Sequence, residues 1–324
     1  MIRTRIVATG RALGSERINN ATLAVRLGVT EEWIEKQSGI RHRHWVSREE
    51  TTSDLALGAS RQALDRAGWD PASLDLIVLS STSPDYPLPA TACLLQGRLG
   101  AHRAYAFDVG ASCSGFLYAL SVADHALRSG TAARALVVGA EVKSPFLNLR
   151  DPSTLILFGD GAGSLLLERR EGKEAGIETL FLHADGAYHH LIRLPAGGSR
   201  RPLSPESLKE AGHTLQMQGA RLFRLAIRRL GEALDEALRG LTLQEVDWFV
   251  FHQANRRILE TLARKRTIPQ EKLLITLTEF GNTSSASLPI ALDVGGNGLF
   301  RPGDRIVLLG FGGGVTWGGA RLIW

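Results

Sequence analysis

The residue best suited to nucleophilic chemistry is Cys113, which is flanked by Ser112, Ser114 and Gly115 in the stretch Phe107 to Leu120. A thiolate is the nucleophilic form of cysteine. It forms most readily at a helix N-terminus, where unpaired N–H groups and the helix dipole favour an anion. A free cysteine is also commonly a small buried residue. The surrounding serines and glycine favour the reactive alternative, although this stretch alone does not decide between the two.

A strand, a sharp turn and a helix are predicted around Cys113. Residues Tyr105 to Val109 alternate and include aromatic and β-branched side chains, which is typical of a strand. The small residues from Gly110 to Gly115 suit a sharp turn. From Phe116 onward, apolar residues recur at helical spacing. We therefore expect Cys113 at a strand-to-helix corner, where the helix would favour its thiolate.

The sequence contains an internal repeat. The segment Arg134 to Gly139 returns 171 positions later as Arg305 to Gly310, and Ala63 to Ala67 returns 170 positions later as Ala233 to Ala237. Two matches at nearly the same offset indicate a duplication. Each half carries a helix and strand pattern typical of an α/β protein with a mostly parallel sheet. We predict an N-terminal half over 1–172 and a C-terminal half over 173–324.

The repeat brings two more polar residues toward Cys113. With an offset of 171, the residue equivalent to Cys113 in the second half is Ser284. The corner that begins at Asn282 is therefore equivalent to the corner that carries Cys113. If the halves pack about a pseudo-two-fold axis, the two corners approach each other. His252 follows the predicted strand Trp248 to Phe251, at the end where open α/β sheets place ligand groups. A lone His or Asn is usually structural, but a thiol, an imidazole and a carboxamide at three strand ends indicate an active site.

Composition limits the class of protein. With 324 residues, of which 44% are hydrophobic and 22% are charged, the chain is neither disordered nor fibrous. Two cysteines cannot form a disulfide framework, and the apolar neighbours Leu94 and Leu95 predict that Cys93 is a buried structural thiol. The first residues lack the apolar core of a signal peptide, and no apolar run reaches the roughly 18 residues of a membrane span. We expect a cytoplasmic protein that does not bind a membrane.

The net charge of +5 indicates an acidic partner or only a solvated basic surface. Arg221, Arg224 and Arg228 share one stripe of a helix predicted from Ala220 to Leu238, and a second basic helix follows His252. Aromatic residues do not interleave with these arginines and no recognition motif is present, so nucleic acid is not expected as a partner. The histidines at 42, 44, 189 and 190 lack further ligands at suitable spacing, and we predict no metal site.

Three motifs carry the candidate residues, Ala-Ser-Cys-Ser-Gly-Phe around Cys113, His-Gln-Ala-Asn-Arg-Arg from His252, and Gly-Asn-Thr-Ser-Ser-Ala-Ser around Asn282. In this order and spacing they resemble the Cys-His-Asn triad of the β-ketoacyl-acyl-carrier-protein synthase III family, of thiolase-like fold. The similarity runs nearly end to end and includes Phe158 to Gly163 and Gly310 to Gly318. It implies a homodimer with a five-layer αβαβα arrangement, built from two duplicated halves with mixed, mostly parallel sheets.

The resemblance also implies a reaction. Cys113 attacks an acyl thioester, and the N–H groups of Cys113 and Gly313 hold the oxyanion. His252 and Asn282 then stabilise the enolate that malonyl-acyl carrier protein leaves on losing carbon dioxide, and this enolate attacks the acyl-cysteine. The product is a β-ketoacyl-acyl carrier protein, at the initiation of fatty acid biosynthesis, and no cofactor or metal is needed. The implied substrate-binding residues are Trp33, Leu88, Gly219, Phe223, Asn255 and Phe311.

Two alternatives have a different function on the same scaffold. One is an acyltransferase or condensing enzyme of specialised metabolism, and the other is a non-enzymatic scaffold that binds the carrier protein. The intact triad favours an enzyme. A thiolase would need a second catalytic cysteine, and Cys93 lies in the wrong sequence context for that role.

The mouth of the site differs from the family pattern. In the family, the region of Trp33 stacks on the adenine of coenzyme A, whereas from the residue alone a loop anchor is an equal alternative. The family commonly has an arginine where this chain has Gln37, and an Arg-Gly pair where it has Pro152 and Ser153. The donor carrier, coenzyme A or acyl carrier protein, therefore stays open.

Three further features are implied by the resemblance. Leu88 lies in a proline-rich loop that reaches across the dimer interface in related proteins to close the acyl pocket. The Pro/Gly-rich stretch from His183 to Met217 is expected to cap the substrate tunnel. Four basic positions match those that bind the acidic acyl carrier protein in the family, namely Arg224, Arg257, Arg264 and Lys265.

Overall fold

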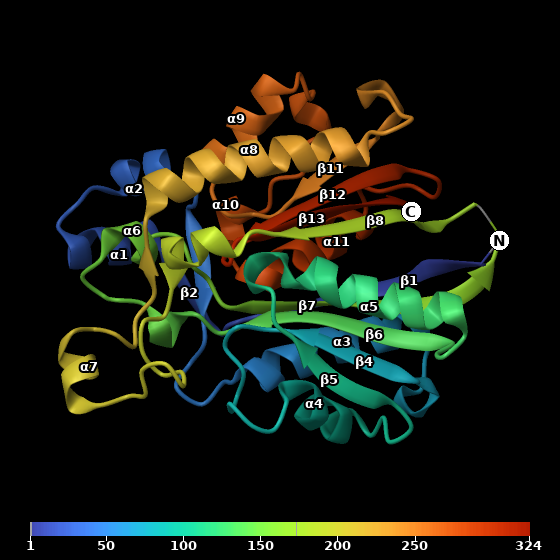
Figure 1. Ribbon diagram of the computed structural model, residues 1–324, viewed down its shortest axis with the longest axis horizontal. Helices are drawn as coiled ribbons and strands as arrows, with labels where there is room; N and C mark the ends of the chain where they lie inside the picture. Colours follow the sequence, from blue (N-terminus) through green and yellow to red (C-terminus); the bar gives the residue numbers. More distant parts are fainter. Residues whose placement is uncertain (1, 173) are drawn as a thin grey trace.

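The computed structural model describes residues 2–172 and 174–324, and its two main β-sheets lie one above the other (Figure 1). The first sheet has the strand order β1-β7-β6-β4-β5, and the second has the order β11-β12-β13-β8. The first sheet comprises β1 (Ile2–Leu13), β7 (Gly161–Glu171), β6 (Arg134–Glu141), β4 (Leu76–Ser80) and β5 (Tyr105–Val109). The second comprises β11 (Trp248–Phe251), β12 (Arg305–Gly312), β13 (Thr316–Ile323) and β8 (Gly176–Ala184).

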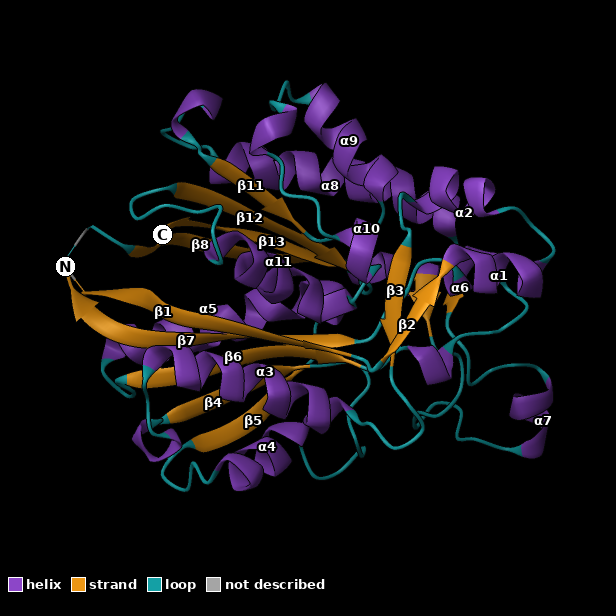
Figure 2. Cartoon of the chain, turned by 180° about the vertical axis from the view of Figure 1, so that it is seen from behind, coloured by secondary structure: helices purple, strands orange, loops and turns teal. Residues whose placement is uncertain are grey.

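Helices fill the space between the sheets and cover their outer faces, which gives five layers (Figures 1 and 2). The central layer contains α5 (Gly115–Ser129) and α11 (Ser287–Gly296), and α11 is buried on nearly all sides because it is apolar all round. The outer layers are α3 (Thr52–Ala67) with α4 (Thr91–Leu99), and α8 (Gly219–Ala237) with α9 (Arg256–Lys265). The predicted αβαβα arrangement is confirmed.

The sheets are mixed, as predicted, but they are not mostly parallel. In the main sheets of the described chain, β4–β5, β4–β6 and β11–β12 are parallel, whereas β1–β7, β6–β7, β12–β13 and β13–β8 are antiparallel. The connection between β12 and β13 shows why. Only residues 313–315 join these strands, and so short a link permits an antiparallel neighbour and not a parallel crossover.

The duplication is visible in the two strand-to-helix corners. Strands β6 and β12 begin 171 positions apart, as the sequence repeat predicts. The offset between the two corners is one residue larger than the offset between the strands. Ser112 and Ser284 are the equivalent positions, because both adopt left-handed backbone conformations, with φ of 49° and 51°. Ser284 therefore matches Ser112 in backbone conformation, rather than Cys113. The predicted boundary falls at residue 173, outside the described residues, and the division into halves stays our proposal.

Shorter elements gather at the end of the sheets where the corners lie (Figure 2). They are β2 (Glu16–Asn19), α1 (Asn20–Leu27), α2 (Glu31–Ser38), β3 (His42–Trp45), α6 (Pro152–Leu155), β9 (Ile192–Arg193), α7 (Pro205–Lys209), β10 (Gln216–Met217) and α10 (Leu277–Phe280). Helix α1 begins after Asn19, which caps its first turn, and ends at Gly28, which has φ of 67°. The stretch 183–217 contains β9, α7 and β10, so it is more ordered than its composition suggests.

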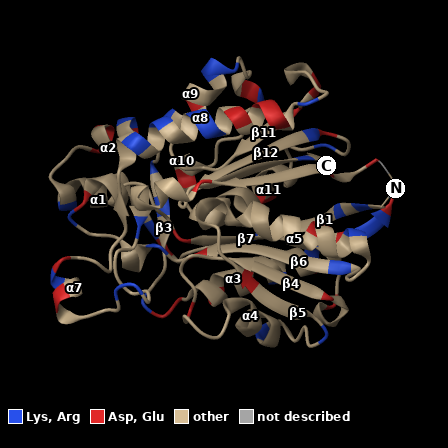
Figure 3. Ribbon diagram, in the orientation of Figure 1, with Lys and Arg blue, Asp and Glu red and all other residues tan. Residues whose placement is uncertain are grey.

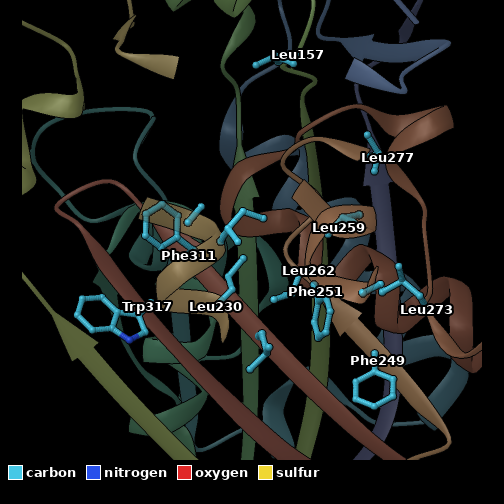
Figure 4. Packing of buried hydrophobic residues seen from close by; sticks show 14 of the residues in the cluster. Leu157, Leu230, Phe249, Phe251, Leu259, Leu262, Leu273, Leu277, Phe311 and Trp317 are labelled. Atoms are coloured by element: carbon cyan, nitrogen blue, oxygen red, sulfur yellow. The ribbon is translucent and has the colours of Figure 1, made fainter. Parts of the chain in front are cut away.

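The apolar core beneath α8 and α9 anchors the strand that leads to His252. Phe249 and Phe251 of β11 are fully buried, and they pack with Leu230, Leu259 and the other leucines of this cluster (Figure 4). Burying each such side chain contributes roughly 1.5–3 kcal/mol, so the position of β11 is strongly determined.

The prediction that Cys93 is buried is wrong. Its side chain is exposed, 3.6 Å from the Ala106 carbonyl oxygen. Helix α4 turns Ala92 and Leu95 toward the core, so Cys93 falls on the outer side, beside the edge strand β5. In the described part of the chain, no helix has the length and apolar character needed to cross a membrane.

Candidate active site

Cys113 lies at the predicted corner between β5 and α5, in a short 3-10 turn, η2 (Ser112–Ser114). Thr316 ties this corner to the second sheet by donating to the Ala111 carbonyl over 3.0 Å and accepting from Ser114 Oγ over 2.7 Å. A side chain at Gly312 would put its Cβ 2.7 Å from the Cys113 nitrogen, so only glycine permits this approach. The corner is therefore fixed from both sheets.

The second corner, η7 (Ser284–Ala286), presents Asn282. The backbone N–H of Asn282 donates to the Leu157 carbonyl over 2.8 Å, and the Asn282 carbonyl accepts from the Gly159 N–H over 3.1 Å. The side-chain Oδ1 accepts from the Ser284 N–H at 2.9 Å. This bond assigns the amide orientation and leaves the Nδ2 donor for the cavity that Asn282 lines.

His252 extends directly from β11, and its backbone N–H donates to the Leu309 carbonyl over 2.8 Å. The ring is buried, and Nδ1 lies 2.6 Å from Ser287 Oγ, so Nε2 is left for the cavity that the residue lines. Burial lowers the pKa of His252 to about 4, while the nearby Glu141 charge acts in the opposite direction. The imidazole is thus neutral at pH 7.

Gln253 is a structural support that the sequence reading did not identify. It is fully buried, and its Oε1 accepts from the Thr276 and Leu277 N–H groups at 2.8 and 3.2 Å. Its Nε2 donates to the carbonyls of Phe251 and Leu274. A glutamine directly after His252, within an apolar strand end, was the available signal for this role.

The expectation of a favoured thiolate at Cys113 is not met. Burial raises the pKa of the Cys113 thiol to about 11, and the Glu141 charge acts in the same direction. The Ser284 hydroxyl and Lys143 partly oppose this rise. The corner does offer N–H groups, but desolvation of the charged form outweighs them. The resting site therefore pairs a neutral thiol with a neutral imidazole.

The catalytic candidates share one cavity of about 630 Å³ with mainly apolar walls. Cys113, His252 and Asn282 all line it. So do most of the predicted substrate-binding and oxyanion-hole residues, namely Trp33, Gly219, Phe223, Asn255, Phe311 and Gly313. Leu88 does not, because 85% of it is exposed on the proline-rich loop. From the capping stretch, only Ile192 and Met217 reach the cavity wall.

The cavity mouth lies among α2, α6 and the N-terminal ends of α8 and α9. Arg224 and Arg257 are its charged residues, and the ribbon coloured for Lys and Arg recurs along α8 and α9 (Figure 3). Arg257 donates to Gln37 Oε1 over 3.1 Å and stacks on Phe223, 5.8 Å from the ring centre. The mouth is thus a basic rim around an apolar tunnel.

Arg264 and Lys265 are exposed at the far end of α9 and do not line the cavity. At about 1.5 Å per residue they lie roughly 10 Å or more along the helix from Arg257. Within residues 2–172 and 174–324, no group of three or more His, Cys, Asp or Glu side chains is placed to hold a metal ion.

Two mixed sheets around a central layer of helices, with a cysteine, a histidine and an asparagine lining one cavity, define a thiolase-like condensing enzyme. The comparisons with known proteins agree. The profiles described as 3-oxoacyl-[acyl-carrier-protein] synthase III and its C-terminal part match residues 107–186 and 235–324. This chain belongs to the β-ketoacyl-[acyl-carrier-protein] synthase III family, so the predicted family and its acyltransferase class are confirmed.

Similarity to individual members extends over the whole chain. The β-ketoacyl-[acyl-carrier-protein] synthase III of Methylococcus capsulatus is 46% identical, with 98% of each chain covered. The crystal structure of 3-oxoacyl-[acyl-carrier-protein] synthase III from Aquifex aeolicus VF5 is 37% identical, with a TM-score of 0.90 over 99% of this chain and 100% of that one. The priming β-ketosynthase of the R1128 polyketide biosynthetic pathway is 33% identical, with a TM-score of 0.91 over 99% and 96%.

Proposed function

We propose that this protein condenses an acyl thioester with malonyl-acyl carrier protein, with loss of carbon dioxide, to give a β-ketoacyl-acyl carrier protein at the start of fatty acid synthesis. The observation that supports this most is the convergence of Cys113, His252 and Asn282 on one apolar cavity. A thiol nucleophile and two hydrogen-bond donors to a thioester oxygen are the groups that the two half-reactions require.

In the first half-reaction, the Cys113 sulfur attacks the acyl carbon of the donor thioester. The Cys113 and Gly313 N–H groups stabilise the oxyanion, and Gly313 lies at the cavity wall where a side chain would contact Ser112 and Ile192. The bond from the acyl carbon to the carrier sulfur then breaks, and the thiol proton ends on the departing thiol.

In the second half-reaction, the malonyl carboxylate leaves as carbon dioxide and its electron pair forms an enolate. The enolate oxygen accepts from Asn282 Nδ2 and from His252 Nε2, in the tautomer where Ser287 donates to Nδ1. The enolate carbon attacks the acyl-cysteine carbonyl, and the Cys113 sulfur leaves as a thiolate that takes up one proton from the solvent. The condensation thus consumes one proton for each carbon dioxide released, and no step needs a metal or an organic cofactor.

We propose docking of the acidic carrier protein on the basic rim, with Arg224 and Arg257 next to the mouth and Arg264 and Lys265 further along α9. The donor is either coenzyme A or acyl carrier protein, and Trp33 at the mouth can pack against the arriving carrier arm. We also propose a cytoplasmic location, because acylation requires Cys113 as a free thiol and a reducing compartment maintains it.

A homodimer completes the proposal. Leu88 and Tyr86 are 85% and 56% exposed on the proline-rich loop, and Tyr105 is 43% exposed on the edge strand β5. Apolar exposure next to an open sheet edge is typical of an interface. In this dimer Leu88 would close the acyl pocket of the partner subunit. Sedimentation of the native protein and of Leu88→Asp tests both parts, since a monomeric native protein contradicts them.

The experiment that tests the function is a panel of acyl thioesters on coenzyme A and on acyl carrier protein. Mass spectrometry of the Cys113 peptide reports which acyl group is transferred and from which carrier. Malonyl-acyl carrier protein is then added, and the β-ketoacyl product is identified. Failure of every thioester to acylate Cys113 contradicts the proposal.

A second function is priming condensation in specialised metabolism, favoured by the likeness to the R1128 priming β-ketosynthase. The same panel distinguishes it, because the preferred acyl group and the accepted carrier protein then differ from those of fatty acid synthesis. A non-enzymatic scaffold would bind the carrier without forming an acyl-cysteine.

A further inference from the structure

The Cys113 thiol has a single hydrogen-bond partner among the described residues, the hydroxyl of Ser284, with the sulfur 3.3 Å from Oγ. Ser284 Oγ also lies 3.0 Å from Oε1 of Glu141. A serine hydroxyl carries one proton, and a carboxylate only accepts. The serine proton is therefore donated to Glu141, and in the resting site the thiol must donate to Ser284.

Glu141 is a fully buried carboxylate at the end of β6. Burial raises its pKa, but the Lys143 ammonium at 3.0 Å and several hydroxyl donors outweigh this, so the pKa of Glu141 lies below its ordinary value. The other donors are Ser83 Oγ at 2.8 Å and Thr82 Oγ1 at 3.1 Å, and Ser285 Oγ at 2.9 Å shares its one proton between Glu141 and the Ser80 carbonyl at 3.0 Å. Glu141 therefore stays well satisfied without the Ser284 proton.

This surplus of donors permits the Ser284 hydroxyl to turn. Rotation about the Cβ–Oγ bond turns the Ser284 hydroxyl proton away from Glu141 and toward the sulfur, and it breaks no other hydrogen bond that Glu141 accepts. A thiolate gains more from such a donor than a neutral thiol gains from an acceptor, because hydrogen bonds to an ionised group are roughly twice as strong.

We propose that Ser284 is a further residue of the condensation reaction, whose hydroxyl accepts from the resting Cys113 thiol and turns from Glu141 to donate to the thiolate. Glu141 is then a positioning residue that holds the hydroxyl in its resting direction. The inference rests on the proposed acyl transfer through Cys113. Ser284 gains and loses no proton overall, since the thiol proton still ends on the departing carrier thiol.

Other titratable groups near the sulfur bear on the same equilibrium. Glu141 and Lys143 act on it from the end of β6, and the neutral His252 lines the same cavity from the end of β11. The Glu141 charge disfavours the thiolate and Lys143 favours it. Removing the Ser284 hydroxyl leaves all three groups in place, so its effect on the sulfur can be isolated.

The test is the pH profile of Cys113 alkylation by iodoacetamide, followed on the Cys113 peptide by mass spectrometry. Ser284→Ala should move the profile up by about one pH unit and slow alkylation at pH 8 about tenfold, because the thiolate loses a hydrogen-bond donor. The matched control is Ser285→Ala, which also removes a hydroxyl bonded to Glu141 Oε1, although Ser285 does not contact the sulfur in the described part of the chain. It should shift the profile far less than Ser284→Ala.

Two further measurements separate the hydroxyl from the backbone and from the proposed function. Ser284 has φ of 51°, which glycine adopts freely, so Ser284→Gly should give the same shift as Ser284→Ala and serves if the alanine variant misfolds. An unchanged profile in both variants overturns the inference, as does an equal shift in Ser285→Ala. Alkylation needs no acyl substrate, so this result is independent of whether the panel of thioesters acylates Cys113.

Discussion

The backbone N–H of Ser284 donates to Oδ1 of Asn282 over 2.9 Å, and this bond decides which end of the Asn282 amide faces the substrate. The carbonyl oxygen is occupied by the corner that carries it, so the amino group is presented to the cavity. The same serine contacts Cys113 through its side chain. One residue of the second corner thereby contacts a group for each half-reaction.

Asn282→Asp should abolish most decarboxylation while keeping the corner folded. One carboxylate oxygen of the aspartate can still accept from the Ser284 N–H. The other oxygen replaces the Nδ2 donor, so a negatively charged acceptor faces the enolate. Loss of one oxyanion donor costs about 10²–10³ in rate, and the repulsion adds to this. The measurement is carbon dioxide release from malonyl-acyl carrier protein. Near-normal release would show that Asn282 does not contact the enolate.

His252→Ala and Asn282→Ala should impair decarboxylation more than acylation of Cys113. Both side chains are placed as donors to the thioester oxygen, whereas the thiol has its own partner in Ser284. Carbon dioxide release and acyl-enzyme formation are measured separately for each variant. Equal loss of both rates in His252→Ala would instead assign it as the base for Cys113, which the high thiol pKa makes a real alternative.

Cys113→Ala should abolish acyl-enzyme formation and condensation, whereas Cys93→Ala should leave both near normal. Cys93 is exposed beside β5 and does not line the cavity, although its exposure lets it react with alkylating reagents. Radiolabelled acyl thioester followed by peptide mapping reports the acylated residue. Loss of label only in the Cys93 variant would reverse the assignment.

The depressed pKa of His252 predicts how stability depends on pH. The unfolded imidazole takes up a proton near pH 6.5, but the folded one does so only near pH 4. Between these values the unfolded state binds more protons, so stability falls as pH decreases from 6.5 to 4. Relative to His252→Gln, the native protein should lose up to about 3 kcal/mol more over this range. Urea unfolding at several pH values measures it, and parallel curves for the two proteins would contradict the shift.

The features predicted correctly from the sequence are mostly local. The strand, small-residue turn and helix around Cys113 follow from spacing within 16 residues. The repeat adds one long-range prediction, the meeting of the two corners. The local inferences succeed because neighbouring side chains alone determine them.

The errors depend on tertiary packing. Whether Cys93 is buried depends on which strand forms the sheet edge, and no local pattern at 91–99 states this. The thiol pKa of Cys113 depends on desolvation and on Glu141, which lies 28 positions later at the end of an otherwise apolar strand. Glu141 and Lys143 read as ordinary polar residues after a strand until the second corner places two serines against them.

The final prediction concerns the basic rim. Arg224→Glu with Arg257→Glu should weaken the reaction with malonyl-acyl carrier protein and flatten its dependence on salt. Acidic carriers are attracted over long distances, and that attraction fades when salt shortens the Debye length to roughly 3 Å near 1 M. The rates are measured at several salt concentrations with the same carrier protein.

Two controls separate docking from damage to the tunnel. Arg61→Glu with Arg301→Glu reverses the same amount of charge at exposed arginines that do not line the cavity, and should keep the carrier reaction and its salt dependence. Acylation of Cys113 by a small N-acetylcysteamine thioester should stay nearly unchanged in the Arg224 and Arg257 variant, because that substrate has no carrier to dock. If small-thioester acylation falls as far as the carrier reaction, the bond from Arg257 to Gln37 and its contact with Phe223 are shaping the mouth, and these arginines are not a docking surface.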